Sequence, residues 1–119
     1  MSNVFLGAFV SFSLLAVGCG APAECAQANS LYDSTRSAVQ ANNYEAGSKS
    51  AGELAALLKD HGTHELSVLG SRSGRLAKDL DALTKTKDPH TQKRLASVVS
   101  SKVKGLSSGA KLAGEACGW

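Results

Sequence analysis

The chain has few aromatic residues, and half of them lie near its start. Phenylalanine occurs only at positions 5, 9 and 12, so the remaining aromatic side chains are Tyr32, Tyr44 and Trp119. A hydrophobic core beyond residue 18 must therefore consist of aliphatic and small side chains. No alternating apolar run of the strand type appears. Apolar or small residues instead recur every three to four positions, which predicts an all-α protein.

Motifs typical of several enzyme and cofactor classes are also missing. The sequence has no C-x-x-C-H haem attachment site, no P-loop and no H-E-x-x-H zinc motif. Asp79 and Asp81 are two residues apart on an expected helix, so their carboxylates do not face each other as a catalytic pair. We therefore expect a protein that is not an enzyme and that carries no cofactor.

Charged side chains are absent from the first part of the chain. Residues 4–18, VFLGAFVSFSLLAVG, are uncharged and almost wholly apolar, but a spanning helix needs about 20 such residues. The segment matches the apolar core of a secretory signal, although only the terminal amine supplies positive charge before it. The sequence thus predicts a signal peptide over residues 1–18. A short membrane anchor and a misplaced start codon are the alternatives.

The end of this segment, Leu15-Ala16-Val17-Gly18-Cys19, resembles the lipobox of bacterial lipoproteins. The resemblance implies cleavage before Cys19 and acylation of its thiol, for example with palmitate, and several acyl chains give stable membrane anchoring. It departs from the preferred pattern at Ala16, where leucine is commonest, and in the missing basic residues. By analogy with enterobacterial lipoproteins, Gly20 in place of Asp after the cysteine implies the outer membrane rather than the inner one. The alternative is an ordinary secretory signal cut after Ala21 or Ala23, which would give a periplasmic or secreted protein.

The remainder is expected to form one domain, residues 22–119, joined to the lipid site by a tether at residues 19–21. The first helix should start at Pro22 and end at Asn42-Asn43, and the second should end near His61-Gly62. Thr63 and Asp88 should cap the third and fourth helices, with Lys85 and Lys87 in the last turn of the third and Gly118 ending the fourth. The expected apolar seams are Cys25, Ala28, Tyr32, Thr35 and Val39; Gly47, Ala51, Leu54 and Leu58; Leu66, Leu69, Ser73, Leu76, Leu80 and Leu83; and Leu95, Val99, Val103, Leu106, Ala110, Ala113 and Cys117.

Glycines at a spacing of four occur on the third and fourth expected helices, at Gly70 and Gly74 and at Gly105 and Gly109. In membranes this spacing marks helix dimers, but these segments are too polar to insert. We expect the glycines to permit close helix packing; a groove for a partner helix is the alternative.

The cysteines constrain the topology. If Cys19 is acylated, Cys25 and Cys117 remain, and an oxidising compartment favours their pairing. A bond requires the Cα atoms to come within about 7 Å. The first helix starts where the last one ends only if the number of helices is even, so the sequence predicts an up-down four-helix bundle closed by a Cys25–Cys117 disulfide.

Two weaker site hypotheses concern a helix junction and the last residue of the chain, Trp119, which should lie at the end of the bundle that holds this disulfide. His61 and His64 lie with acidic neighbours in D-H-G-T-H-E and are weak metal candidates, since His and carboxylate groups suit zinc or copper. Solvated loop residues are the alternative. Trp119 is a candidate for contact with the membrane interface, where tryptophan is favoured. Packing over the disulfide is its alternative.

Positive charge is concentrated in the second half of the chain. Residues 20–62 carry three basic and five acidic groups, whereas residues 63–119 carry ten and five. The candidate surface for an anionic group or a partner comprises Arg72, Arg75, Lys78, Lys93 and Lys102, with the first three expected on one face; an ordinary solvated face is the alternative. The charge is too dispersed for a nucleic-acid site. We expect a lipid-anchored envelope protein whose helices bind another envelope protein or an anionic surface, or a periplasmic helical bundle that binds a ligand or metal, or a secreted effector or inhibitor without lipid.

Overall fold

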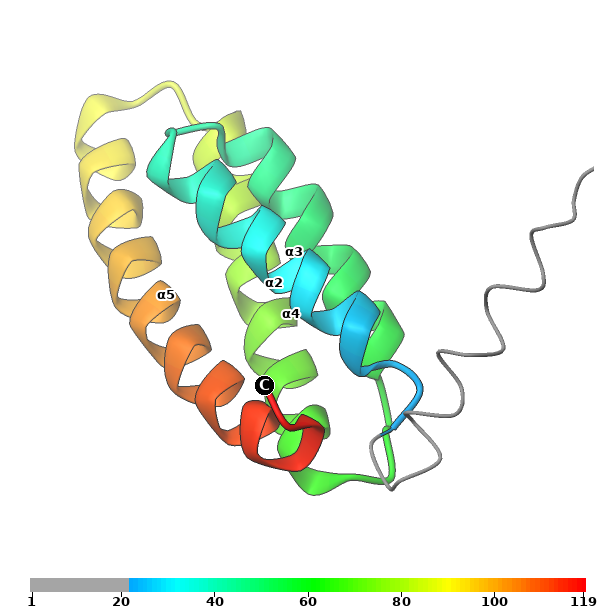
Figure 1. The fold of residues 1–119 in the computed structure, drawn as a ribbon. Helices are drawn as coiled ribbons and strands as arrows, with labels where there is room; N and C mark the ends of the chain where they lie inside the picture. Colours follow the sequence, from blue (N-terminus) through cyan, green and yellow to red (C-terminus); the bar gives the residue numbers. More distant parts are fainter. Residues whose placement is uncertain (1–21) are drawn as a thin grey trace, which may run out of the picture.

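A computed structural model describes residues 22–119, so the predicted signal peptide, Cys19 and the rest of the 19–21 tether lie outside the described residues. This part of the chain forms four helices and no strand: α2 (Cys25–Gln40), α3 (Tyr44–Leu58), α4 (His64–Lys85) and α5 (Pro89–Cys117). They run up and down as a four-helix bundle (Figure 1). The predicted fold class is confirmed, including the Cys25–Cys117 disulfide that closes the bundle.

The helices pack as a ring, α2 on α3, α3 on α4 and α4 on α5, and the ring closes where α5 meets α2. The pairing of α2 with α5 is much the slightest of the four. These two helices differ in length, with 16 residues in α2 and 29 in α5. In Figure 1, α5 lies to one side of α2.

Leucine dominates the core. The predicted seams of α3 and α4 are buried at every position, and Gly70 is buried with them. The seams of α2 and α5 are only partly buried, because Tyr32, Val39, Leu95, Val103 and Cys117 pack against the core from its edge. Loose contact between α2 and α5 therefore leaves their facing side chains half-buried. The largest fully buried side chains are those of Leu54, Leu58, Leu66, Leu69, Leu76, Leu80, Leu106, Thr35 and Ser73.

Two predicted helix ends need correction. α2 begins at Cys25 rather than Pro22, and the carbonyl of Pro22 accepts a hydrogen bond from the Cys25 N–H in the preceding turn (3.2 Å). α3 ends at Leu58, and Asp60 rather than Gly62 takes the left-handed conformation (φ 56°). Asp is one of the few residues besides Gly that visit this region, because its short polar side chain can hydrogen-bond locally.

The ends of α2 and α5 agree with the sequence, whereas two predicted details at the ends of α4 need correction. Asn42 adopts a positive φ of 59° in the α2–α3 turn. The side chain of Asp88 caps α5 by accepting from the Thr91 N–H at 2.9 Å, and Gly118 ends that helix with φ 79°. Thr63 occupies the N-cap position of α4, but its side chain makes no capping hydrogen bond. Lys85 is the last residue of α4, so Lys87 lies in the following loop.

Glycine permits close contact at two helix crossings. A Cβ added at Gly70 would lie 2.8 Å from Leu58 Cβ and 3.3 Å from the Leu58 carbonyl carbon, so α3 and α4 approach closely there. At Gly109 an added Cβ would lie 3.3 Å from Arg72 Cδ and 3.6 Å from Leu69 Cα. Gly105 differs, since an added Cβ would meet nothing within 4 Å. Close packing thus accounts for Gly70 and Gly109 but not for Gly105.

Candidate functional site

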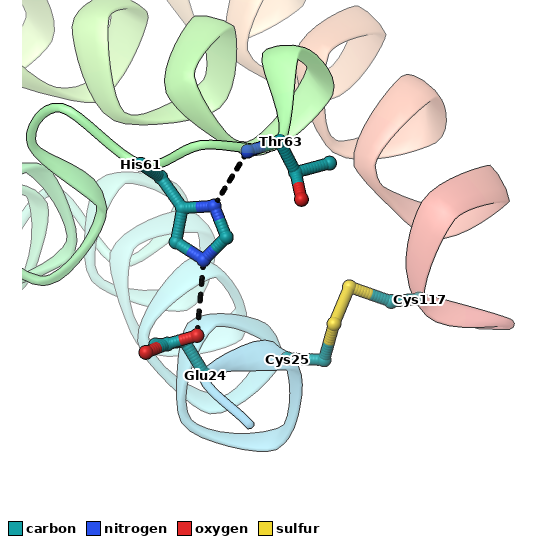
Figure 2. Close-up of a disulfide and its surroundings, with 5 residues drawn as sticks. All are labelled: Glu24, Cys25, His61, Thr63 and Cys117. Carbon is teal, nitrogen blue, oxygen red and sulfur yellow. Dashed lines mark hydrogen bonds and ion pairs between the residues drawn. A yellow bond between two sulfur atoms is a disulfide. The ribbon is translucent and has the colours of Figure 1, made fainter. Parts of the chain in front are cut away.

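The disulfide joins the first and last helices at one end of the bundle, which we call the disulfide pole: residues 22–25, the 59–64 loop and residues 111–119. Cys25 and Cys117 are 92 residues apart in sequence, and their Cα atoms lie 5.7 Å apart (Figure 2). Cys25 is buried, with 6% exposure. Closing a loop of this length stabilises the folded state by about 4–5 kcal/mol on the chain-entropy model. The bond therefore supplies much of the connection between α2 and α5.

His61 ties the α3–α4 loop to this pole (Figure 2). Its Nδ1 accepts a hydrogen bond from the Thr63 backbone N–H at 3.0 Å, and its Nε2 lies 3.0 Å from Glu24 Oε1. Because Nδ1 accepts, the ring proton belongs on Nε2, which donates to the Glu24 carboxylate. Neutral His61 thus satisfies both contacts. The sequence analysis missed this link, although an up-down topology brings the 59–64 loop to the start of α2.

The same contact favours the ionised form of Glu24. The hydrogen bond from His61 lowers the pKa of the Glu24 carboxyl from its ordinary value of 4.5, and a backbone hydrogen bond of Glu24 acts in the same direction. Slight burial opposes both effects. The carboxylate is therefore favoured in the folded state. The Glu24–His61 contact thus has an electrostatic as well as a geometric component.

The metal candidates are placed differently from each other. His61 is half-buried with both ring nitrogens engaged, whereas His64 is exposed at the first position of α4. Within residues 22–119 no group of three His, Cys, Asp or Glu side chains is arranged to hold a metal ion. Binding of a metal through His61 would have to break its contact with Thr63 or with Glu24.

Trp119 lies at the disulfide pole, just beyond α5. Its backbone N–H donates to the Gly114 carbonyl at 3.0 Å, because left-handed Gly118 turns the chain back toward the helix. A Cβ added at Gly114 would lie 3.4 Å from Trp119 Cβ and 3.5 Å from its ring atom Cε3. The side chain therefore covers the last turn of its own helix. It remains 42% exposed, and Leu112 is the other large hydrophobic residue exposed in the described part of the chain.

Three of the five predicted basic residues meet between α4 and α5. Arg72, Arg75 and Lys102, with Ser101 and Gly105, line a hollow of about 220 Å³ that we call the arginine hollow. Nη1 of Arg72 donates to the Gly105 carbonyl at 2.9 Å, and Lys102 forms an ion pair with Asp79 of α4. The hollow is open at one side, where Arg75 is exposed.

The other two basic residues lie elsewhere. Lys78 lines a hollow between α3 and α4, together with Lys59 and Asp60. Lys93 lines another at the far end of the bundle, beside Tyr44 and Leu83. The expectation that Arg72, Arg75 and Lys78 share one face needs correction, because each step of three residues falls about 60° short of a full helical turn.

A shallow groove that the sequence analysis did not anticipate runs between the end of α2 and the first half of α5. It encloses about 340 Å³ and is lined by Val39, Asn42, Tyr44, Ala96, Val99, Ser100, Val103 and Lys104. The groove exists because α2 and α5 are joined mainly at the disulfide and by a hydrogen bond between the hydroxyls of Tyr32 and Ser107 (3.0 Å). The half-buried seam residues of both helices give it an apolar floor.

No protein-family model, curated protein sequence or solved structure matches the chain. A search of residues 22–119 also finds no helix long and apolar enough to cross a membrane.

Proposed function

We propose that this chain is a lipid-anchored envelope protein whose helical bundle is a non-enzymatic binding module. The carrying observation is the position of Cys25, which starts α2, belongs to the disulfide pole and follows Cys19 by six residues. An extended chain spans at most about 3.6 Å per residue. A lipid on Cys19 would therefore hold the disulfide pole within about 20 Å of the bilayer surface.

The charge at the two ends of the bundle supports an orientation for the anchored domain. Acidic residues outnumber basic ones at the disulfide pole and in the adjoining first turn of α4: Glu24, Asp60, Glu65 and Glu115 against Lys59 and Lys111. The opposite end carries an excess of basic residues: Arg36, Lys85, Lys87, Lys93 and Arg94 against Glu45, Asp81 and Asp88. Anionic headgroups repel the nearer, acidic end. The proposed domain thus stands away from the membrane with its basic end outward.

The surface of the bundle offers a binding partner several open hollows. The hollows described above lie between helices and along the sides of the bundle. A membrane at the disulfide pole would therefore leave them accessible to a partner. Lipid attachment would place these surfaces at high local concentration near other envelope components. The arginine hollow presents two guanidinium groups, and the α2–α5 groove presents an apolar floor.

Membrane fractionation of cells that produce the Cys19→Ala variant tests the proposal. Wild-type protein should sediment with membranes and resist extraction with high salt, since acyl chains rather than charge hold it. Removing the acyl site should release the protein into the soluble fraction or stop its processing. The Lys78→Gln variant, which removes one positive charge outside the anchor, should stay in the membrane pellet. Wild-type protein recovered wholly in the soluble fraction would contradict the proposal.

A further inference from the structure

We infer that the arginine hollow between α4 and α5 binds a phosphate-type oxyanion, either free or as part of a larger molecule. The inference rests on the proposed role of the bundle as a binding module, but not on the lipid anchor. Its residues come from adjacent turns of two packed helices, namely Arg72 and Arg75 of α4 and Ser101, Lys102 and Gly105 of α5. The α4–α5 packing therefore fixes their relative positions.

Arg72 is held in place before any ligand arrives. Its guanidinium donates one hydrogen bond to the Gly105 carbonyl at 2.9 Å, and its Cδ lies 3.3 Å from the position that a Cβ on Gly109 would occupy. A guanidinium has five N–H donors in a planar fork that matches phosphate oxygens. Four donors remain after the bond to Gly105. Because the side chain is already ordered, little conformational entropy remains to be lost on binding.

The charges around the hollow leave a net positive potential. Lys102 is paired with Asp79, so these two side chains largely neutralise each other. Among residues 22–119 neither Arg72 nor Arg75 forms an ion pair with a carboxylate, and Ser101 adds a hydroxyl that can donate a hydrogen bond. Two guanidinium groups and a hydroxyl are groups that recognise a tetrahedral oxyanion.

Gly105 makes the space for the ligand. The helix carries no side chain at this position, and a Cβ built there meets nothing within 4 Å. Packing between helices therefore does not explain the glycine, whereas the floor of an open hollow does. The hollow of about 220 Å³ admits a small oxyanion with some of its water, since a water molecule occupies about 30 Å³ in the liquid.

The test is an NMR titration of the purified, disulfide-bonded protein with inorganic phosphate, with chloride used to hold the ionic strength constant. We expect saturable shifts centred on Arg72, Arg75, Ser101 and Gly105. Arg75→Gln should weaken binding about tenfold, because it removes charge-assisted hydrogen bonds at the mouth. Gly105→Leu should abolish binding by filling the hollow, and an unchanged circular dichroism spectrum should show that the bundle is still folded.

Lys78→Gln is the matched control, since it removes one positive charge from α4 at a different hollow. It should bind phosphate as the wild-type protein does. Equal weakening by Lys78→Gln and Arg75→Gln, or shifts that spread over the surface without saturating, would overturn the inference. Neither result bears on acylation of Cys19, which membrane fractionation tests separately.

A second arm identifies the source of the oxyanion. Vesicles of phosphatidylglycerol and of phosphatidylcholine are mixed with the Cys19→Ala protein, which has no acyl chain to bind both kinds of vesicle, and sedimented. Co-sedimentation with the anionic vesicles that Arg75→Gln weakens and Lys78→Gln does not would support a lipid headgroup. Phosphate binding without vesicle binding would support a soluble phosphorylated ligand. Gly105 is twelve residues from Cys117, which corresponds to about 18 Å along α5, so an upright anchored bundle favours the soluble source.

Discussion

His61 and Glu24 show how a single side chain can settle the position of a loop. The ring accepts from Thr63 and donates to Glu24, each at 3.0 Å, so the 59–64 loop is fixed to the start of α2. The sequence suggested His61 and His64 as weak metal candidates because they are close in sequence. In the folded chain the side chain that hydrogen-bonds to His61 is that of Glu24, 37 residues away. Local spacing alone does not reveal such a contact.

The Glu24–His61 contact predicts a pH-dependent contribution to stability. Because the pKa of Glu24 is lowered in the folded state from 4.5, its contribution is fully present above pH 4.5 and disappears as the pH falls through the lowered value. Glu24→Gln keeps an oxygen acceptor but no charge. At pH 7 it should reduce the free energy of unfolding by less than about 1 kcal/mol, since Glu24 is 39% exposed and solvent screens the pair.

Urea denaturation of wild-type and Glu24→Gln protein at several pH values measures this contribution, and an NMR titration of the Glu24 carboxyl measures its pKa directly. The difference between the two proteins should vanish at pH 2. In His61→Ala the pKa should return toward 4.5, because the main cause of its lowering is gone. A Glu24→Gln difference that is the same at pH 7 and pH 2 would rule out the charged contact.

At the scale of the helix, apolar periodicity predicted α3 and α4 better than α2 and α5. α3 and α4 each pack extensively against two neighbouring helices. Each of their seam positions is therefore enclosed and buried. α2 and α5 meet only slightly, and Val39 and Val103 on the same kind of seam remain half-buried. Periodicity reports which face is apolar, but it does not report how completely a neighbouring helix covers that face.

Helix ends were predictable where a side chain or a glycine has one dominant local role. Asp88-Pro89 and Gly118 behave as their sequence suggests. The end of α3 does not, since Gly62 is available but Asp60 takes the left-handed turn. The Glu24–His61 contact fixes the loop beyond Asp60, and that contact depends on the whole fold.

Substitution by alanine should have opposite effects on stability at two helical glycines, Gly70 at the crossing of α3 with α4 and Gly52 elsewhere on α3. In Gly70→Ala the new Cβ would lie 2.8 Å from Leu58 Cβ and 3.3 Å from backbone, so one helix must shift. Overpacking of this kind costs about 1–3 kcal/mol, against which alanine regains about 1 kcal/mol of helix propensity. We expect net destabilisation. Gly52→Ala in α3 meets nothing within 4 Å and should stabilise the protein by up to about 1 kcal/mol.

Thermal and urea unfolding of the two variants provide the comparison, because both exchange a helical glycine for alanine and differ only in what surrounds the new methyl group. The Tm of Gly70→Ala should fall and that of Gly52→Ala should rise. A Gly70→Ala variant as stable as Gly52→Ala would mean that α3 and α4 do not approach as closely as the structure has them.

For the whole molecule, the disulfide relates the short separation of Cys19 and Cys25 in sequence to the proposed orientation of the bundle at the membrane. Its partners are the first residue of α2 and the last residue of α5, so both chain ends of the bundle lie at one pole. The number of cysteines left after Cys19 predicted this pairing, and the pairing in turn favoured an even number of helices. It did not predict the arginine hollow, because that site depends on how α5 is rotated against α4, which brings Gly105 opposite Arg72.

The central claim of our account is that Cys19 and Cys25 have different roles, one as the anchor and the other as half of the disulfide. The intact mass of the native mature protein, measured before and after reduction and alkylation, tests it most directly. We predict a chain that begins at Cys19, carries acyl groups and lacks the thiol hydrogens of Cys25 and Cys117 until it is reduced. A chain that begins after Ala21 or Ala23 and carries no acyl group would contradict the claim.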